Sequence, residues 1–160
     1  MKTKCQEEPH EVSRYIRIPA GDVHLMADLQ VPQLATSVVI FAYEFGGSRN
    51  HPRPRHVARV MREYGLATLL CDLLTDEEEI KEGGGGINRH NVALLAERVI
   101  AVTKWVAKEP ELKKMKLAYF GASSGGGAAL IAAATLPKKV KAVVSRGGRG
   151  DLAAKCWTKV

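Results

Sequence analysis

The sequence is poor in cysteine, and its cysteines form no pattern that builds a site. Cys5, Cys71 and Cys156 are the only three, an odd number at wide spacing, whereas a disulfide framework usually shows an even number in a short chain. No CxxC pair and no cluster of cysteine with histidine is present, so the sequence predicts no metal site. We expect a protein of a reducing, cytoplasmic compartment that uses no metal and no cofactor.

Long apolar runs are also missing. Lys2 and Lys4 open the chain without an apolar stretch behind them, which is not the pattern of a secretory signal peptide. No segment reaches the roughly 20 apolar residues that a membrane-spanning helix needs. We therefore expect no membrane partner.

Basic residues exceed acidic ones, but they do not gather in one stretch. The formal net charge is +7, and a basic balance often indicates a nucleic-acid partner. Bases that are dispersed along the chain are more often solvated surface, and on that ground we expect no nucleic-acid partner. The bases fall in three groups, at Lys113, Lys114 and Lys116, at Lys138, Lys139 and Lys141, and at Arg49, Arg53 and Arg55.

The length of 160 residues corresponds to one domain. Residues 1–11 are polar and predict a flexible N-terminal tail, and residues 12–160 then form the domain. Segments with the apolar pattern of strands are 12–18 and 23–31, which would form a hairpin, followed by 37–42, 66–72, 116–120 and 140–145.

Helical spacing separates the later strands. Apolar residues recur every three or four positions from about His56 to Tyr64 and from Asn88 or Asn91 to Ala107, and an alanine-rich helix covers 128–136. Residues 75–89 are acidic and then glycine-rich, which favours a mobile loop, and the last residues carry at most a short helix at 151–156. Alternating strands and helices predict an α/β fold, a mostly parallel sheet with helices on both faces behind an N-terminal hairpin.

The strongest chemical motif follows the strand at 116–120. Residues 121–125 read Gly-Ala-Ser-Ser-Gly, a G-x-S-x-G, which places Ser123 on a sharp strand-to-helix turn with its hydroxyl at the mouth of the sheet. The alternative is a glycine-rich turn that binds a phosphate or nothing. A P-loop is excluded because Gly127 stands where the lysine would be.

The segments that carry these elements together resemble the dienelactone-hydrolase-like branch of the α/β-hydrolase family. They are SVVIFA, YEFGGSRNHPRPR, LATLLCDLLTDEEE, HNVALLAERVIAVTKWV, YFGASSGGGAAL and AVVSRGGRGDLA, and they span roughly residues 12–155. The resemblance implies a serine hydrolase of small carboxylic esters or lactones, with Ser123 as the nucleophile. It also implies an oxyanion hole from the Ser124 N–H and the loop at Glu44 and Phe45, where the family usually has His-Gly.

The resemblance implies a triad in the order serine, acid, histidine, with the last two on later loops. No histidine follows Ser123, and the chain ends at Val160, so we expect a domain that lacks the C-terminal strands of the fold. His51 and His90 follow strands on the same side as Ser123 and are candidate bases, with Asp151 to orient one of them. The simpler interpretations are surface histidines and a helix N-cap.

Three functions therefore stay open. The chain is a serine esterase with an unusual base, or a catalytically impaired relative that binds a small molecule or a protein as a homodimer, or an incomplete fold that persists by dimerising. We expect a homodimer, because the strand at 140–145 would leave one sheet edge uncovered and such an edge tends to pair with another chain.

Overall fold

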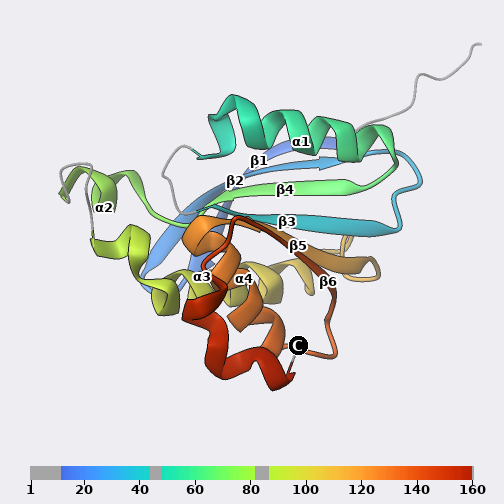
Figure 1. Ribbon diagram of the computed structural model, residues 1–160. Coiled ribbons are helices and arrows are strands. Elements are labelled where there is room, and N and C mark those ends of the chain that lie inside the picture. The colour runs from blue at the N-terminus through green and yellow to red at the C-terminus, as the bar shows by residue number, and fades with distance from the viewer. Residues whose placement is uncertain (1–11, 44–47, 82–86, 160) are drawn as a thin grey trace, which may run out of the picture.

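The computed structural model describes residues 12–43, 48–81 and 87–159, and Figure 1 shows their arrangement. The tail predicted at residues 1–11 lies outside the described residues. The chain folds in the order β1, β2, β3, α1, β4, α2, α3, β5, α4 and β6, with short 3-10 helices η1 at Ser48–Asn50, η2 at Ile87–His90 and η3 at Gly150–Lys159. No helix of the described part is both long and apolar enough to cross a membrane.

The sheet begins with the predicted hairpin. β1 (Val12–Ala20) pairs antiparallel with β2 (Val23–Val31), and Gly21 takes a φ of +66° in the turn between them. This conformation is open to glycine at little cost. Ile18 and Leu25 of the hairpin are fully buried, and Ile16 and Ala20 pack half-buried against the same core.

Four parallel strands complete the six-stranded sheet, in the order β1-β2-β4-β3-β5-β6. They are β3 (Ser37–Tyr43), β4 (Ala67–Asp72), β5 (Lys116–Ala122) and β6 (Val140–Arg146). β2 joins β4 in antiparallel register, and the remaining neighbours are parallel. The predicted fold class is confirmed.

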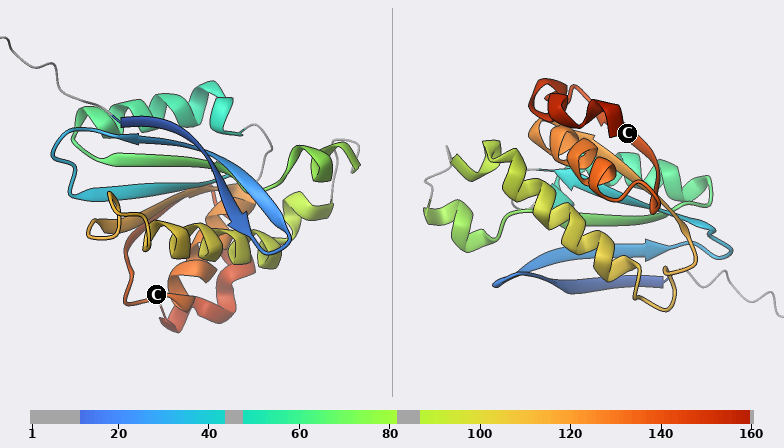
Figure 2. Two further views of the ribbon diagram at one scale, coloured as in Figure 1. Left: turned by 180° about the vertical axis from the view of Figure 1, so that it is seen from behind. Right: turned by 90° about the horizontal axis from the view of Figure 1, so that it is seen from below.

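Helices cover both faces of this sheet (Figures 1 and 2). α1 (Pro52–Glu63) lies on one face over a small core that includes Phe41 and Phe120. The other face carries α3 (Val92–Val106), α4 (Ser123–Thr135) and η3 over a larger core. Because β4, β3, β5 and β6 are parallel, their carboxyl ends lie at one edge of the sheet. Ligands bind at this edge in this kind of architecture.

Two helices begin earlier than the sequence predicts. α1 starts at Pro52 rather than near His56, because Pro52 suits the first helical turn and the His51 Nδ1 accepts a hydrogen bond from the Arg53 N–H at 3.3 Å. α4 starts at Ser123 rather than Ala128, so the serine turn is itself the first turn of the helix.

The prediction of a mobile loop at 75–89 is wrong for its first part. Residues Asp76–Lys81 form α2, which opens with a capping box: the Glu78 N–H donates to the Thr75 hydroxyl, and the Thr75 N–H donates to the Glu78 carboxylate. The buried Arg98 of α3 binds both Glu78 and the Leu73 carbonyl. This ion pair fixes α2 to the body of the domain.

Candidate active site

Ser123 holds a strained backbone conformation at the junction of β5 and α4. Its φ is +49°, and Leu34 is the one other described non-glycine residue with a positive φ. For an L-residue this region costs roughly 1–2 kcal/mol, and such strain persists only where the surrounding structure enforces it. The geometry is that of a nucleophile elbow, in which the serine side chain is turned out of the strand.

The glycines on either side of Ser123 are required by close packing. A Cβ on Gly121 would lie 2.7 Å from the Gly125 carbonyl oxygen, because the strand and the helix nearly touch. A Cβ on Gly125 would overlap the carbonyl oxygen of Ala42 in β3 and lie 2.8 Å from its carbonyl carbon. Both contacts are with backbone atoms, which cannot swing away, so residues 121 and 125 must be small.

The loop after β6 packs against the same turn. The Arg149 N–H donates to the Ser123 carbonyl oxygen at 3.0 Å, and a Cβ on Gly126 would lie 2.9 Å from the Gly148 Cα. Residues 147–149 thus brace the elbow from the side opposite to β3. This support explains how the strained φ of Ser123 is maintained.

The first turn of α4 has donors suited to an anion. Its N-cap is Ala122, which makes no side-chain cap, so no capping side chain occupies the N-terminal end of the helix. Ser124 is buried at 1% exposure beside the half-buried Ser123. The positive end of the helix therefore faces the region in front of the Ser123 hydroxyl.

The second part of the predicted oxyanion hole starts close to this turn. Ala42 pairs with Gly121 across the β3–β5 ladder, so the segment that follows Tyr43 begins beside the elbow. Glu44 and Phe45, the residues predicted to contribute there, lie outside the described residues. Tyr43 itself stacks on Phe41 and Phe120, with ring centroids 6.3 and 6.4 Å away.

The described histidines make no hydrogen bond with the serine. Within the described part of the chain, the Ser123 hydroxyl has no hydrogen-bond partner. His51 is exposed and its Nδ1 caps α1, and His90 is exposed at the end of η2. Their assignment as bases therefore stays a prediction.

Asp151 is held by a neighbour rather than by a histidine. It accepts hydrogen bonds from the Arg149 Nε at 2.9 Å and Nη2 at 2.8 Å. These bonds hold the pKa of Asp151 below its usual value. Its role in orienting a base also stays a prediction.

One ion pair at the mouth is only half visible in the sequence. Asp72 ends β4, which places its carboxylate at the mouth of the sheet, but no sequence pattern marks its partner Arg49. Asp72 is 4% exposed and accepts from the Arg49 N–H and Nε, each at 2.9 Å. The pair anchors η1 to the carboxyl end of β4.

Cys71, the residue before Asp72, is not a second nucleophile. Burial raises the pKa of the Cys71 thiol, which therefore stays protonated and is a poor nucleophile.

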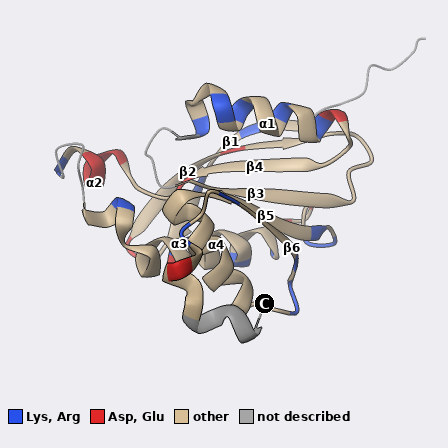
Figure 3. Ribbon diagram, viewed as in Figure 1, with Lys and Arg blue, Asp and Glu red and all other residues tan. Residues whose placement is uncertain are grey.

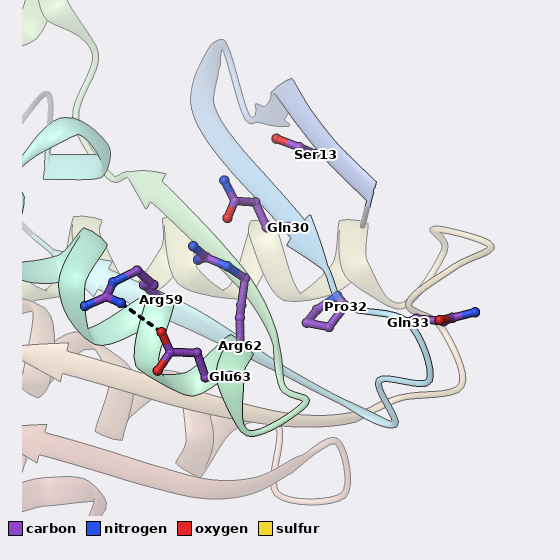
Figure 4. A pocket seen from close by; sticks show the side chains of 7 residues that line it. All are labelled: Ser13, Gln30, Pro32, Gln33, Arg59, Arg62 and Glu63. Carbon is purple, nitrogen blue, oxygen red and sulfur yellow. Dashed lines mark hydrogen bonds and ion pairs between the residues drawn. The ribbon is translucent and has the colours of Figure 1, made fainter. Parts of the chain in front are cut away.

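A large hollow lies away from this site (Figure 4). It has a volume of about 620 Å³ between α1 and the hairpin, and its lining includes Gln30, Arg59 and Arg62. Gln30 pairs with Thr68 near the beginning of β4, whereas Ser123 follows the end of β5. The hollow is therefore at the opposite end of the sheet and is not the serine site.

No protein-family model matches the chain. Among solved structures, the dienelactone hydrolase from Anabaena variabilis is 46% identical, with a TM-score of 0.87 over 91% of this chain and 68% of that one. The chain belongs to the dienelactone-hydrolase-like α/β hydrolases. A lidless serine hydrolase from Xanthomonas campestris shares the fold at 20% identity, with a TM-score of 0.66 over 83% of this chain and 60% of that one.

Two curated relatives of the chain are named after a different activity from that of the dienelactone hydrolase. Two Mycobacterium tuberculosis proteins, provisionally named phosphoribosyl transferases, are 47% identical over 138 residues. The match covers 86% of this chain but only 30% of each relative. The chain thus spans under a third of the length of those relatives.

Proposed function

We propose that this domain hydrolyses small carboxylic esters or lactones through an acyl intermediate on Ser123. The observation that carries the proposal is the φ of +49° at Ser123 between two glycines that backbone packing requires. A plain strand-to-helix turn has no need for this strain, whereas a nucleophile elbow uses it to expose the hydroxyl. The proposal concerns this domain and not the longer proteins that contain a similar one.

The chemistry follows from the groups around the turn. The Ser123 Oγ attacks the carbonyl carbon while a base takes its proton, and the Ser124 N–H donates to the oxyanion that forms. The carbonyl reforms as the alkoxide leaves with that proton; in a lactone the alkoxide stays attached as the ring opens. Water then attacks the acyl-serine by the same steps, which returns Ser123 and releases the carboxylic acid.

The base is the second element of the proposal. A hydroxyl needs an adjacent base to become a good nucleophile at neutral pH, and the Ser123 hydroxyl has no partner among the described residues. We propose His90 or His51 as this base, supplied from the same chain or from a second copy. The His51 Nδ1 accepts a hydrogen bond from the Arg53 N–H in the α1 cap, so in the neutral ring the hydrogen is on Nε2. His51 must therefore release this cap before its Nε2 can take the serine proton.

The direct test is hydrolysis of a short-chain p-nitrophenyl ester by the wild type and by S123A, S124A, H51A and H90A. We expect S123A to lose turnover and S124A to retain most of it, because the backbone N–H survives that change. Loss in one histidine variant identifies the base. A specific activity that rises with protein concentration indicates a base from a second copy, and equal rates in wild type and S123A would overturn the proposal.

The same hydroxyl, unpartnered among the described residues, favours a second candidate function. If no base reaches Ser123, the mouth serves as a binding site for a small molecule or a protein in a homodimer. The exposed last strand supports the dimer: in β6, Ala142 is exposed and Val144 is 49% exposed. Saturable binding of an ester analogue without turnover would distinguish this function from catalysis.

A further inference from the structure

Two groups of lysines that are far apart in the sequence meet at one end of the sheet. One group lies just before and at the start of β5, and the other lies just before and at the start of β6 (Figure 3). Because β5 and β6 are parallel neighbours, their amino ends lie side by side. The two groups line one hollow of about 290 Å³, which we call the lysine hollow; its six lysines are Lys113, Lys114, Lys116, Lys138, Lys139 and Lys141.

The positive charge of the lysine hollow is not balanced by the protein. Glu109 and Glu111 precede the first lysines, but Arg14 of β1 binds both of them, at 3.0 and 2.7 Å. No acidic residue is among the described residues that line the hollow. Within the described part of the chain none of the six lysines forms an ion pair, although the Lys141 Nζ donates to the Lys138 carbonyl oxygen at 3.4 Å.

This arrangement favours an anion. Like charges held close together repel, and a concave site lined by one sign of charge attracts counter-ions of the other sign. The hollow is also walled by buried apolar side chains, with Val106, Leu112 and Leu117 each at most 6% exposed. The six lysines themselves are exposed, so their ammonium groups are free to reach an anion that sits against this wall.

We infer that the lysine hollow binds a small molecule with several phosphate groups. Lysine carries a compact positive charge that binds phosphate oxygens without fixed geometry. A group of six lysines can therefore bind several phosphate groups of one ligand at the same time. A volume of about 290 Å³ lies at the lower end of small-molecule pockets. The described lining has no arginine and no aromatic ring, whereas single-stranded nucleic-acid sites rely on aromatic stacking.

The lysine hollow is separate from the serine site. β5 runs from Lys116 to Ala122, so the hollow and Ser123 lie at opposite ends of that strand, roughly 20 Å apart at about 3.3 Å per residue. Binding at the hollow therefore stands or falls independently of ester hydrolysis.

The test is calorimetric titration of the 160-residue chain with orthophosphate, inorganic tripolyphosphate and ATP at low salt. The site variant is K114E/K139E, with one lysine from each group. Its matched control is R53E/K81E, which changes the net charge equally at exposed positions on α1 and α2. We expect tripolyphosphate and ATP to bind more tightly than orthophosphate, and the site variant to bind them at least about tenfold more weakly, with little change in the control.

The possible outcomes distinguish recognition of phosphate groups from a general effect of net charge. Tripolyphosphate binding as tight as that of ATP indicates recognition of the phosphates alone, and tighter ATP binding adds the nucleoside; both support the inference. Equal weakening in the site variant and the control would overturn it, since the effect would then be net charge. Binding of heparin or RNA without binding of tripolyphosphate would also overturn it, in favour of a long polyanion.

Discussion

Gly125 in the first turn of α4 packs directly against Ala42 at the end of β3, and a Cβ on the glycine would lie 2.8 Å from the Ala42 carbonyl carbon. The contact couples the helix that follows Ser123 to the strand that leads into the predicted oxyanion loop. Because both partners are backbone atoms of central elements, neither can move without disturbing the sheet. The turn that holds Ser123 is therefore built into the packing of the core.

The first prediction concerns this contact. G125A should lower the free energy of unfolding by about 3 kcal/mol or more, the upper end of the usual cost of overpacking. The measurement is urea unfolding. G21A is the matched control, since Gly21 has a φ of +66° but a methyl group added to it would meet nothing within 4 Å, so it should lose only about 1 kcal/mol. Similar losses in the two variants would contradict the close approach.

A second prediction concerns the strain at Ser123. S123G should be more stable than S123A by about 1 kcal/mol, because glycine adopts a φ of +49° without the penalty that alanine retains. Thermal unfolding of both variants measures the difference. Leu34, which has a φ of +66° and is 90% exposed, supplies the control, and L34G should gain over L34A in the same way. A more stable S123A would show that Ser123 does not hold the left-handed conformation in solution.

The third prediction concerns pH. Hydrogen bonds from Arg98 lower the pKa of Glu78 below its ordinary value near 4.5. The ionised carboxylate therefore stabilises the fold at pH values above 4.5, and this contribution is lost as the pH falls through the lowered pKa. E78Q should cost about 2 kcal/mol at neutral pH, because it leaves the buried Arg98 without its ionic partner, and the cost should shrink in acid.

Unfolding in urea at several pH values between about 7 and 3 checks this dependence. The control is E77Q, because Glu77 is exposed on the same helix and forms no ion pair among the described residues. A constant difference between E78Q and wild type across this range would contradict the coupling of α2 to Arg98.

A fourth prediction concerns the open edge. If two copies associate through β6, wild type should sediment as a dimer and V144K as a monomer, because a lysine on an edge strand opposes pairing. I80K is the control, since Ile80 is 79% exposed on α2 and far along the chain from β6. A wild type that sediments as a monomer at all concentrations would contradict the proposed homodimer.

The sheet and the serine turn were predictable because their signals are local. Buried parallel strands show short apolar runs, as in residues 37–42 and 66–72, and the G-x-S-x-G motif directly follows another mostly apolar run. The helix at Asp76–Lys81 was also within reach, since Thr75 and Glu78 have the spacing of a capping box. The acidic run and the glycines that follow it concealed that signal.

Other features depend on contacts between distant segments and have no local signal. The pairing of Arg49 with Asp72 and the joining of the two lysine groups both require the order of the strands, which periodicity does not specify. His51 as a helix cap is uncommon among N-cap residues. The base for Ser123 is a similar case, because it depends on which side chain reaches the mouth in space.

The measurement that tests the central claim most directly is labelling with a fluorophosphonate, followed by mass spectrometry of the intact and digested protein. Such reagents phosphonylate a serine only when it is activated, so the account predicts one label per chain, located on Ser123 and lost in S123A but kept in S124A. No label on the folded wild type, or a label on another residue that persists in S123A, would contradict Ser123 as the nucleophile.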